Sequence, residues 1–377
     1  MSADEAKKHW KRFWFNFPIR TGYRLLDFLL PAIPATFLLK YWIHASSLIL
    51  FFAAAIAIIP LAAALGTATE ELSIQAGPRV GGLLNATLGN ATELILGVFM
   101  LRGNQVEIVK ASLSGSVIGN ILLVLGMSAL PAGLQKNIQK VPRRTAQLNS
   151  GMLFVAMAAL AMPVIFSLSQ FGSLTVHAYR VIVLSRWTSG VLIVVYGLGL
   201  VRTLLATSPP GTRELHESGQ QRSRWWALAA LSGSTVLLSI LSEILVGGIE
   251  TAKHALGISD LFMGVVVIAI IGNVAEHTSA LLMAQRNRME VAFIITVGSS
   301  VQIALLVTPA LVLLSWIVGH PMSLLFTPLE LLGIGVAVVA TSILAGDGET
   351  TWFDGVQLLA LYFIFAVAVY LMPPHSS

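Results

Sequence analysis

The chain has 377 residues, of which 56% are hydrophobic and 11% are charged. Ordinary soluble domains carry roughly 25% charged residues, so this composition argues against one and indicates that lipid solvates most of the surface. The absence of cysteine excludes disulfides, thiolate metal sites and cysteine nucleophiles. The net charge of +5 is typical of cytoplasmic loops in membrane proteins, and we expect no nucleic-acid partner.

Residues 1–22 combine basic and aromatic side chains. The members are Lys7, Lys8, Trp10, Lys11, Arg12, Phe13, Trp14, Phe15, Phe17 and Arg20. This composition predicts a basic amphipathic segment lying on the membrane surface. The alternative is that the charges only set the topology. We expect no signal peptide, because the first eleven residues are polar and no clear cleavage site follows the first apolar run.

Eleven apolar runs follow, each near the length of about 20 residues that crosses a bilayer. They cover residues 25–43, 46–66, 81–101, 109–132, 146–167, 184–206, 225–248, 257–284, 289–315, 323–345 and 352–372. We therefore predict an all-α polytopic membrane protein with eleven transmembrane helices.

Basic residues gather in three of the connecting loops. These are Lys136, Lys140, Arg143 and Arg144 in the first, Arg202, Arg213, Arg222 and Arg224 in the second, and Arg286 and Arg288 in the third. An amino terminus in the cytoplasm places all three loops there, and eleven crossings place the carboxyl terminus outside. The polar linker 208–224 then separates a first five-helix unit, 46–207, from a second, 225–377, with 23–45 as an extra helix.

Two short motifs repeat at a constant offset along the chain. Gly89-Asn90-Ala91-Thr92-Glu93 is echoed by Gly272-Asn273-Val274-Ala275-Glu276. The same offset, without any gap, relates Asn104 to Asn287, Glu107 to Glu290, and Gly115-Ser116 to Gly298-Ser299. Because five helices separate the copies, the second copy is inverted in the membrane. Such repeats build one shared site near the bilayer midplane.

Glu93 and Glu276 lie in apolar runs without lysine or arginine, and a carboxylate there indicates a functional site. A buried helix–helix ion pair is the alternative. Asn90 and Asn273 share a helix face with the glutamates. Neighbouring runs carry polar stripes, which are either oxygen ligands or interhelical packing contacts. They are Ser112, Ser116 and Asn120, and Thr296, Ser299 and Gln302. Carboxylate, amide and hydroxyl oxygens suit a hard cation such as Ca²⁺.

Two bare carboxylates in a low-dielectric site are strongly disfavoured, and either a divalent cation or protons neutralise them. This predicts exchange of metal for protons. His277 either relays a proton or is a hydrogen-bonded core residue. Glu70 and Glu243 lie in related contexts, Thr69-Glu70-Glu71-Leu72 and Ser242-Glu243-Ile244-Leu245. They suit flanking positions on a cation pathway, although Glu70 also fits a solvated helix end.

The segment Gly81 to Leu94, GGLLNATLGNATEL, resembles the first repeat motif of the calcium/cation–proton exchangers, the CAX family. Gly272 to His277, GNVAEH, resembles the second. Ala68 to Leu72, Gly115 to Gly126 and Gly298 to Gln302 also resemble the family pattern, so that the resemblance extends from about Ala45 to the end.

The resemblance implies an antiporter that exports Ca²⁺ from the cytosol in exchange for H⁺, with an extra helix before a five-plus-five inverted repeat. It implies that Glu93 and Glu276 carry both metal and protons. The resemblance also implies that the site is lined by Asn90, Asn273, Ser116, Ser299 and Gln302 and is flanked by Glu70 and Glu243. One departure is the linker, where Glu214 and Glu217 stand among four arginines, so a regulatory acidic helix is not expected.

Three other functions compete with this hypothesis. A sodium/calcium exchanger would use similar architecture, a cation channel would use the same carboxylates, and an intramembrane metalloenzyme would need a motif such as His-Glu-x-x-His, which the sequence lacks. We expect no enzymatic activity and no bound cofactor, with Ca²⁺ and H⁺ as transported ions. Homo-oligomerisation is compatible with the sequence. A bacterial plasma membrane is the expected location, with a vacuolar membrane as the alternative.

Overall fold

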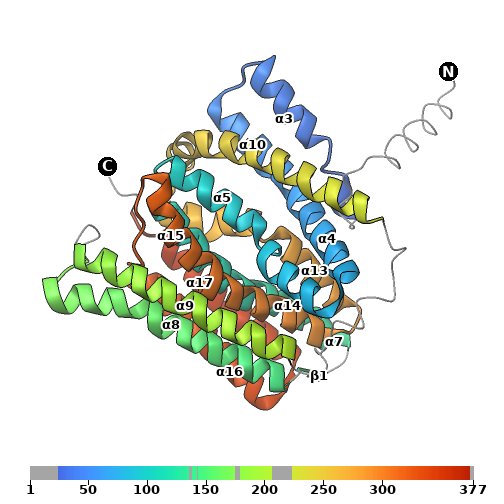
Figure 1. The fold of residues 1–377 in the computed structure, drawn as a ribbon, viewed down its shortest axis with the longest axis vertical. Coiled ribbons are helices and arrows are strands. Elements are labelled where there is room, and N and C mark those ends of the chain that lie inside the picture. The colour runs from blue at the N-terminus through green and yellow to red at the C-terminus, as the bar shows by residue number, and fades with distance from the viewer. Residues whose placement is uncertain (1–23, 136–137, 142, 175–178, 206–222, 374–377) are drawn as a thin grey trace.

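The computed structural model describes residues 24–135, 138–141, 143–174, 179–205 and 223–373. The predicted surface segment, 1–22, and the predicted linker up to residue 222 lie outside this part of the chain. Almost all described residues are helical, and the ribbon in Figure 1 shows the helices packed along one another.

The helices before the linker differ widely in length. They are α2 (Arg24–Asp27), α3 (Ala32–Tyr41), α4 (Ser47–Leu88), α5 (Ala91–Arg102), α6 (Val106–Ile118), the π-helical η1 (Gly119–Val124), α7 (Leu125–Gln135), α8 (Arg143–Phe171) and α9 (Tyr179–Leu205).

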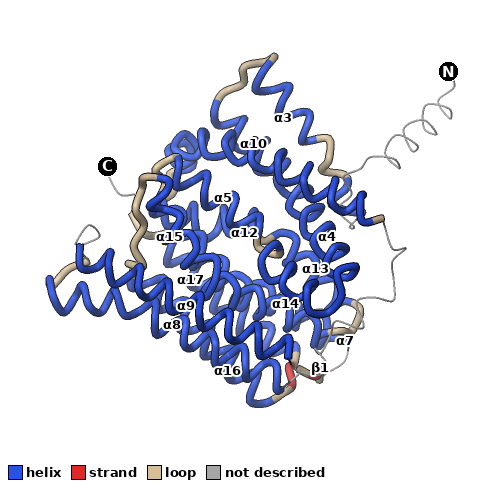
Figure 2. The backbone as a smooth tube through the Cα atoms, viewed as in Figure 1, coloured by secondary structure: helices blue, strands red, loops and turns tan. Residues whose placement is uncertain are grey.

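The helices after the linker follow a similar order. They are α10 (Arg224–Leu256), α11 (Asp260–Phe262), the π-helical η3 (Met263–Ile268), α12 (Ala269–Gly272), α13 (Val274–Gln285), α14 (Met289–Gln302), the π-helical η4 (Ile303–Val307), α15 (Thr308–Val318), α16 (Pro328–Asp347) and α17 (Trp352–Tyr370). Two short strands, β1 (Gln139–Lys140) and β2 (Glu349–Thr350), pair antiparallel and are red in Figure 2.

Nine helices in the described residues are long and apolar enough to cross a membrane. They are Ser47–Gly77, Val80–Arg102, Val106–Leu134, Arg143–Phe171, Tyr179–Leu205, Arg224–Leu256, Met289–Val318, Pro328–Asp347 and Trp352–Tyr370. A tenth consists of Asp260–Gly272 and Val274–Gln285, which meet at a bend of 63°. These ten correspond to the last ten of the eleven predicted spans, and their outward faces carry large apolar side chains such as Trp187 and Ile317.

The first predicted span, 25–43, is not one helix. Its residues form α2 and α3, separated by a turn that includes Pro31. Proline has no N–H for a helical hydrogen bond and interrupts the ladder. The ten residues of α3 cover only about 15 Å at 1.5 Å per residue, half of the roughly 30 Å hydrocarbon core. Within the described residues, α3 packs against α4 and does not span a bilayer by itself.

The helices pack around a central group formed by α5, α6, α12, α13 and α14. Long α4 and α10 lie against each other on one side of this group, and α8 and α9 lie side by side on another (Figure 1). Two glycines let α6 and η3 approach closely: a Cβ on Gly115 would clash with the backbone of Val265, and one on Gly264 would lie 2.7 Å from the Ile108 carbonyl. This contact joins the two halves of the chain beside the repeated motifs.

Candidate cation-binding site

Both glutamates of the repeated motif lie in the first turn of a helix that follows a break. Asn90 precedes α5 with φ −103° and ψ 26°, and Asn273 precedes α13 with φ −100° and ψ 15°. These dihedrals lie near the sparsely populated bridge region, so the helix stops and restarts at each asparagine. The restart places Glu93 and Glu276 at helix amino termini, where the helix dipole stabilises a carboxylate.

The two breaks meet in the interior. A Cβ on Gly272, the last residue of α12, would lie 3.9 Å from Glu93 Cγ, so the break before Glu276 lies against Glu93. A small cavity opens beside Glu93. Its polar lining comes from Glu93, Ser112, Ser116 and Asn273, and its apolar lining from Leu96, Met100, Leu113 and Ile268. The site is therefore built from both halves of the chain.

The first half leaves three oxygen atoms without partners. Asn90 Nδ2 donates to Gln302 Oε1, but Asn90 Oδ1 and both carboxylate oxygens of Glu93 are buried without a hydrogen-bond partner in the described structure. An isolated ionised carboxylate in such a place is strongly disfavoured. A cation or a proton would remove that penalty, and oxygen ligands of this kind suit Ca²⁺.

The second half has a more complete hydrogen-bond network. Asn273 Nδ2 donates to Ser116 Oγ at 2.7 Å and to the Ala269 carbonyl at 2.9 Å. Asn120 Nδ2 lies 3.4 Å from Asn273 Oδ1 and 3.3 Å from Ser299 Oγ. His277 Nε2 lies 3.0 Å from Asn120 Oδ1. Four of the predicted residues, Asn273, Ser116, Ser299 and His277, therefore belong to one network, and Asn120 contacts three of them.

Among the described residues, no group of three or more His, Asp or Glu side chains gathers as a metal cluster. The carboxylates instead sit beside amide and hydroxyl oxygens. Such a mixed oxygen set fits a cation that is carried as substrate and released, because it holds Ca²⁺ with fewer charges than a tight buffering site does.

The two predicted flanking glutamates lie outside the lining of the cavity. Glu70 on α4 and Glu243 on α10 both have exposed side chains and do not line the cavity. α4 and α10 lie against each other, so both carboxylates belong to one helix pair beside the site. Their role on a cation pathway stays a prediction.

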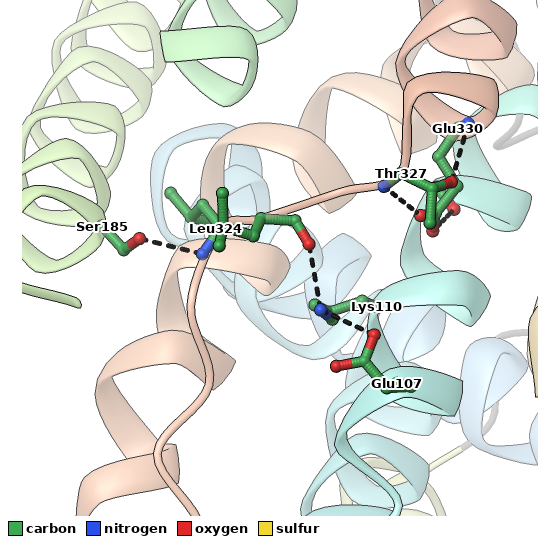
Figure 3. Close-up of polar contacts among 8 residues, drawn as sticks. Glu107, Lys110, Ser185, Leu324, Thr327 and Glu330 are labelled. Atoms are coloured by element: carbon green, nitrogen blue, oxygen red, sulfur yellow. Dashed lines mark hydrogen bonds and ion pairs between the residues drawn. The ribbon is translucent and has the colours of Figure 1, made fainter. Parts of the chain in front are cut away.

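The face of α6 opposite the cavity carries a second polar cluster, which was not predicted from the sequence (Figure 3). Lys110 is buried and contacts Glu107 Oε2 at 2.7 Å and the Leu325 carbonyl at 2.9 Å. Ser114 donates to Glu330 Oε1 at 2.7 Å, and Thr327 N donates to Glu330 Oε2 at 2.8 Å. These contacts hold α6 against the start of α16.

A capping motif was the available signal for Glu330. Thr327-Pro328-Leu329-Glu330 has the Ser/Thr-x-x-Glu spacing of a capping box, and the structure forms one. The helix accordingly begins at Pro328, later than the start of the predicted span 323–345. The sequence placed Asn120 in a polar stripe, but the spacing of that stripe did not predict its contacts with Asn273, Ser299 and His277.

Comparisons with known proteins agree with this architecture. The chain matches the family model described as sodium/calcium exchanger protein over residues 46–205 and 226–371. It is 38% identical over 365 residues to the Ca(2+)/H(+) antiporter of Aphanothece halophytica, covering 92% of this chain and 96% of that protein. It is 37% identical over 341 residues to the vacuolar calcium ion transporter of Schizosaccharomyces pombe, covering 89% and 82%. The solved structure of native YfkE matches with a TM-score of 0.80 at 36% identity, covering 93% of this chain and 100% of that one.

Proposed function

Because the chain belongs to the sodium/calcium exchanger protein family, we propose that it is a secondary transporter that exchanges Ca²⁺ for protons. The observation that carries the proposal is the position of Glu93 and Glu276 at two adjoining helix breaks, where both carboxylate oxygens of Glu93 are buried without a hydrogen-bond partner. Protons are favoured over Na⁺ as the driving ion because the Aphanothece halophytica relative is named a Ca(2+)/H(+) antiporter. The family resemblance of the two repeated motifs agrees with this assignment.

Charge balance explains why the two ions are exchanged. With Ca²⁺ bound, or with a proton on each glutamate, the pair is neutral. The empty, doubly charged pair repels itself in a low-dielectric interior. Conversion between inward- and outward-facing states is therefore fast when the site is loaded and slow when it is empty. This penalty couples Ca²⁺ export to proton entry without any covalent step.

Each ligand has a defined task in this proposal. Glu93 and Glu276 bind the metal and, alternately, the protons. Asn90, Asn273, Ser116, Ser299 and Gln302 line the site, and oxygen atoms from among them complete the coordination. His277 relays protons beside Glu276, and Glu70 and Glu243 flank the pathway.

We propose an inverted five-plus-five repeat, preceded by residues 23–45 as an extra segment in which a turn separates α2 from α3. Matched helices support it: α5 and α13 each have 12 residues and begin directly after the matched asparagines. Asn104 and Asn287, which the repeat also relates, both have φ 58°. The five-helix units are 46–207 and 225–377, with a cytoplasmic linker at 208–224. The amino terminus is cytoplasmic and the carboxyl terminus is outside.

A bacterial plasma membrane is the proposed location. The name of the Schizosaccharomyces pombe relative raises a vacuolar membrane as the alternative.

Reconstitution in proteoliposomes tests the function. An outward movement of protons should accompany Ca²⁺ uptake in Na⁺-free buffer, and an imposed pH gradient should drive Ca²⁺ against its own gradient. A protonophore should abolish this uphill transport. Ca²⁺ uptake that needs Na⁺ and survives the protonophore would instead establish a sodium/calcium exchanger.

A further inference from the structure

Asn120 lies at the centre of the site although the repeat does not predict it. Its side chain is fully buried in η1, a π-helical segment of the kind often found at functional sites. The matching position in the second copy of the repeat is Ile303, which has no polar side chain. Asn120 is therefore a feature of one half only, and its contacts make the two halves of the site unequal.

The hydrogen-bond directions around Asn120 follow from one backbone carbonyl. The Ala269 oxygen can only accept, so the Asn273 group 2.9 Å away must be the Nδ2 amide. Asn273 Oδ1 then faces Asn120, which must donate from its own Nδ2. Asn120 Oδ1 consequently faces His277 Nε2 and can only accept, so Nε2 must carry the hydrogen.

These hydrogen-bond directions determine which atoms of Asn273 face the cavity. Asn273 presents its NH₂ group toward Ser116, and both residues line the cavity. An amide NH₂ group cannot bind a cation. Rotating Asn273 to bring its oxygen there would place two oxygens together at the Ala269 carbonyl. Asn90, by contrast, keeps a buried oxygen without a partner.

We propose, resting on the function proposed above, that Asn120 is a positioning residue that orients Asn273 and His277. It holds the Asn273 oxygen away from the cation, so that Asn90 supplies the asparagine ligand. It also holds His277 with a hydrogen on Nε2, which leaves Nδ1 as the position that faces away from this network.

Nitrogen-15 NMR of histidine-labelled wild-type protein in lipid tests the orientation without any transport measurement. The His277 signals are assigned as those lost in His277→Gln. At a pH where the ring is neutral, we expect a protonated Nε2 and an unprotonated Nδ1. A neutral ring with its hydrogen on Nδ1 would overturn the proposal, even if Ca²⁺/H⁺ exchange were fully established.

Two substitutions of Asn120 separate its contacts. Asn120→Asp keeps an acceptor for His277 but removes the donor to Asn273, so the Nε2–H signal should persist. Asn120→Leu removes both and should yield a mixture of the two neutral ring forms. Ile303→Leu, at the matching position of the other half, is the control and should leave the His277 signals unchanged. An unchanged signal in Asn120→Leu would contradict the proposal.

A double-mutant cycle on Ca²⁺ transport tests the action through Asn273. Losing an outer-shell partner typically weakens metal binding by about 10–100-fold, and we expect a KM change of that order for Asn120→Leu. In an Asn273→Ala background, the same substitution should change KM by less than about twofold, because the partner is absent. If the KM changes of Asn120→Leu and Asn273→Ala simply multiply in the double variant, the proposal is overturned. Absence of all exchange in the wild type would instead contradict the proposed function and leave the NMR result standing.

Discussion

Asn90 and Asn273 occupy the same backbone position at the start of two matched helices, yet they make different hydrogen bonds. Asn90 donates to Gln302 and keeps a free buried oxygen. Asn273 donates to Ser116 and to the Ala269 carbonyl, and its oxygen faces Asn120. Two equivalent sequence motifs therefore form a site in which the Asn90 oxygen has no hydrogen-bond partner and the Asn273 oxygen faces Asn120.

Neutralising either central glutamate should abolish exchange. Glu93→Gln and Glu276→Gln each remove a charge needed to balance Ca²⁺ and a group that carries a proton. We expect Ca²⁺-dependent proton flux in proteoliposomes to fall by more than about 100-fold, beyond the 10–100-fold typical of an outer-shell partner. Glu290→Gln, an exposed carboxylate on α14, is the matched control and should transport normally. Normal exchange by either site variant would exclude the carboxylate mechanism.

Removing the amide of Asn90 should weaken Ca²⁺ binding while leaving the protein folded. Asn90→Ala loses the unpartnered oxygen and leaves Gln302 without its partner. We expect KM for Ca²⁺ to rise by about 10–100-fold, with a smaller change in maximal rate. Asn90→Asp keeps the Oδ1 oxygen and should bind Ca²⁺ more tightly than Asn90→Ala in the same initial-rate assay. An unchanged KM in Asn90→Ala would rule out Asn90 as a ligand.

Two glycines that match in the repeat should respond differently to the same substitution. A Cβ on Gly115 would clash with the Val265 backbone, whereas one on Gly298 meets nothing within 4 Å. Gly115→Ala should lower stability by about 1–3 kcal/mol, the usual effect of overpacking, and lower the melting temperature in detergent. Gly298→Ala should leave it unchanged. Equal melting temperatures for the two variants would contradict the close α6–η3 contact.

The polar cluster behind α6 should contribute stability through Glu330. Glu330→Leu leaves the Thr327 amide without its side-chain acceptor and Ser114 with only the Ala111 carbonyl, and an unsatisfied buried group costs about 1–3 kcal/mol. Glu330→Gln retains one carbonyl oxygen and should lose less. In detergent, the wild type should have the highest melting temperature, Glu330→Gln a lower one and Glu330→Leu the lowest. A leucine variant as stable as the wild type would show that the cluster contributes nothing.

The site residues that could be predicted were those whose own sequence neighbours make them unusual. A carboxylate inside an apolar run is visible in the sequence because burying it is unfavourable, and Glu93 and Glu276 were identified in this way. Glu330 was overlooked because Ser114, which donates to its carboxylate, lies on a helix from the other half of the chain. The first predicted span failed because hydropathy does not register the turn before α3.

The sequence by itself determined that the chain is a polytopic helical membrane protein of this family, because apolar run length and the two repeated motifs are properties of neighbouring residues. Only the tertiary structure decided which oxygens are free. Hydrogen-bond direction depends on groups brought together from distant helices: Asn273 lies between the Ala269 carbonyl and Asn120, and Asn120 also contacts His277. The two motifs look equivalent in the sequence, and contacts with two unmatched residues, Gln302 and Asn120, make them different in the folded protein.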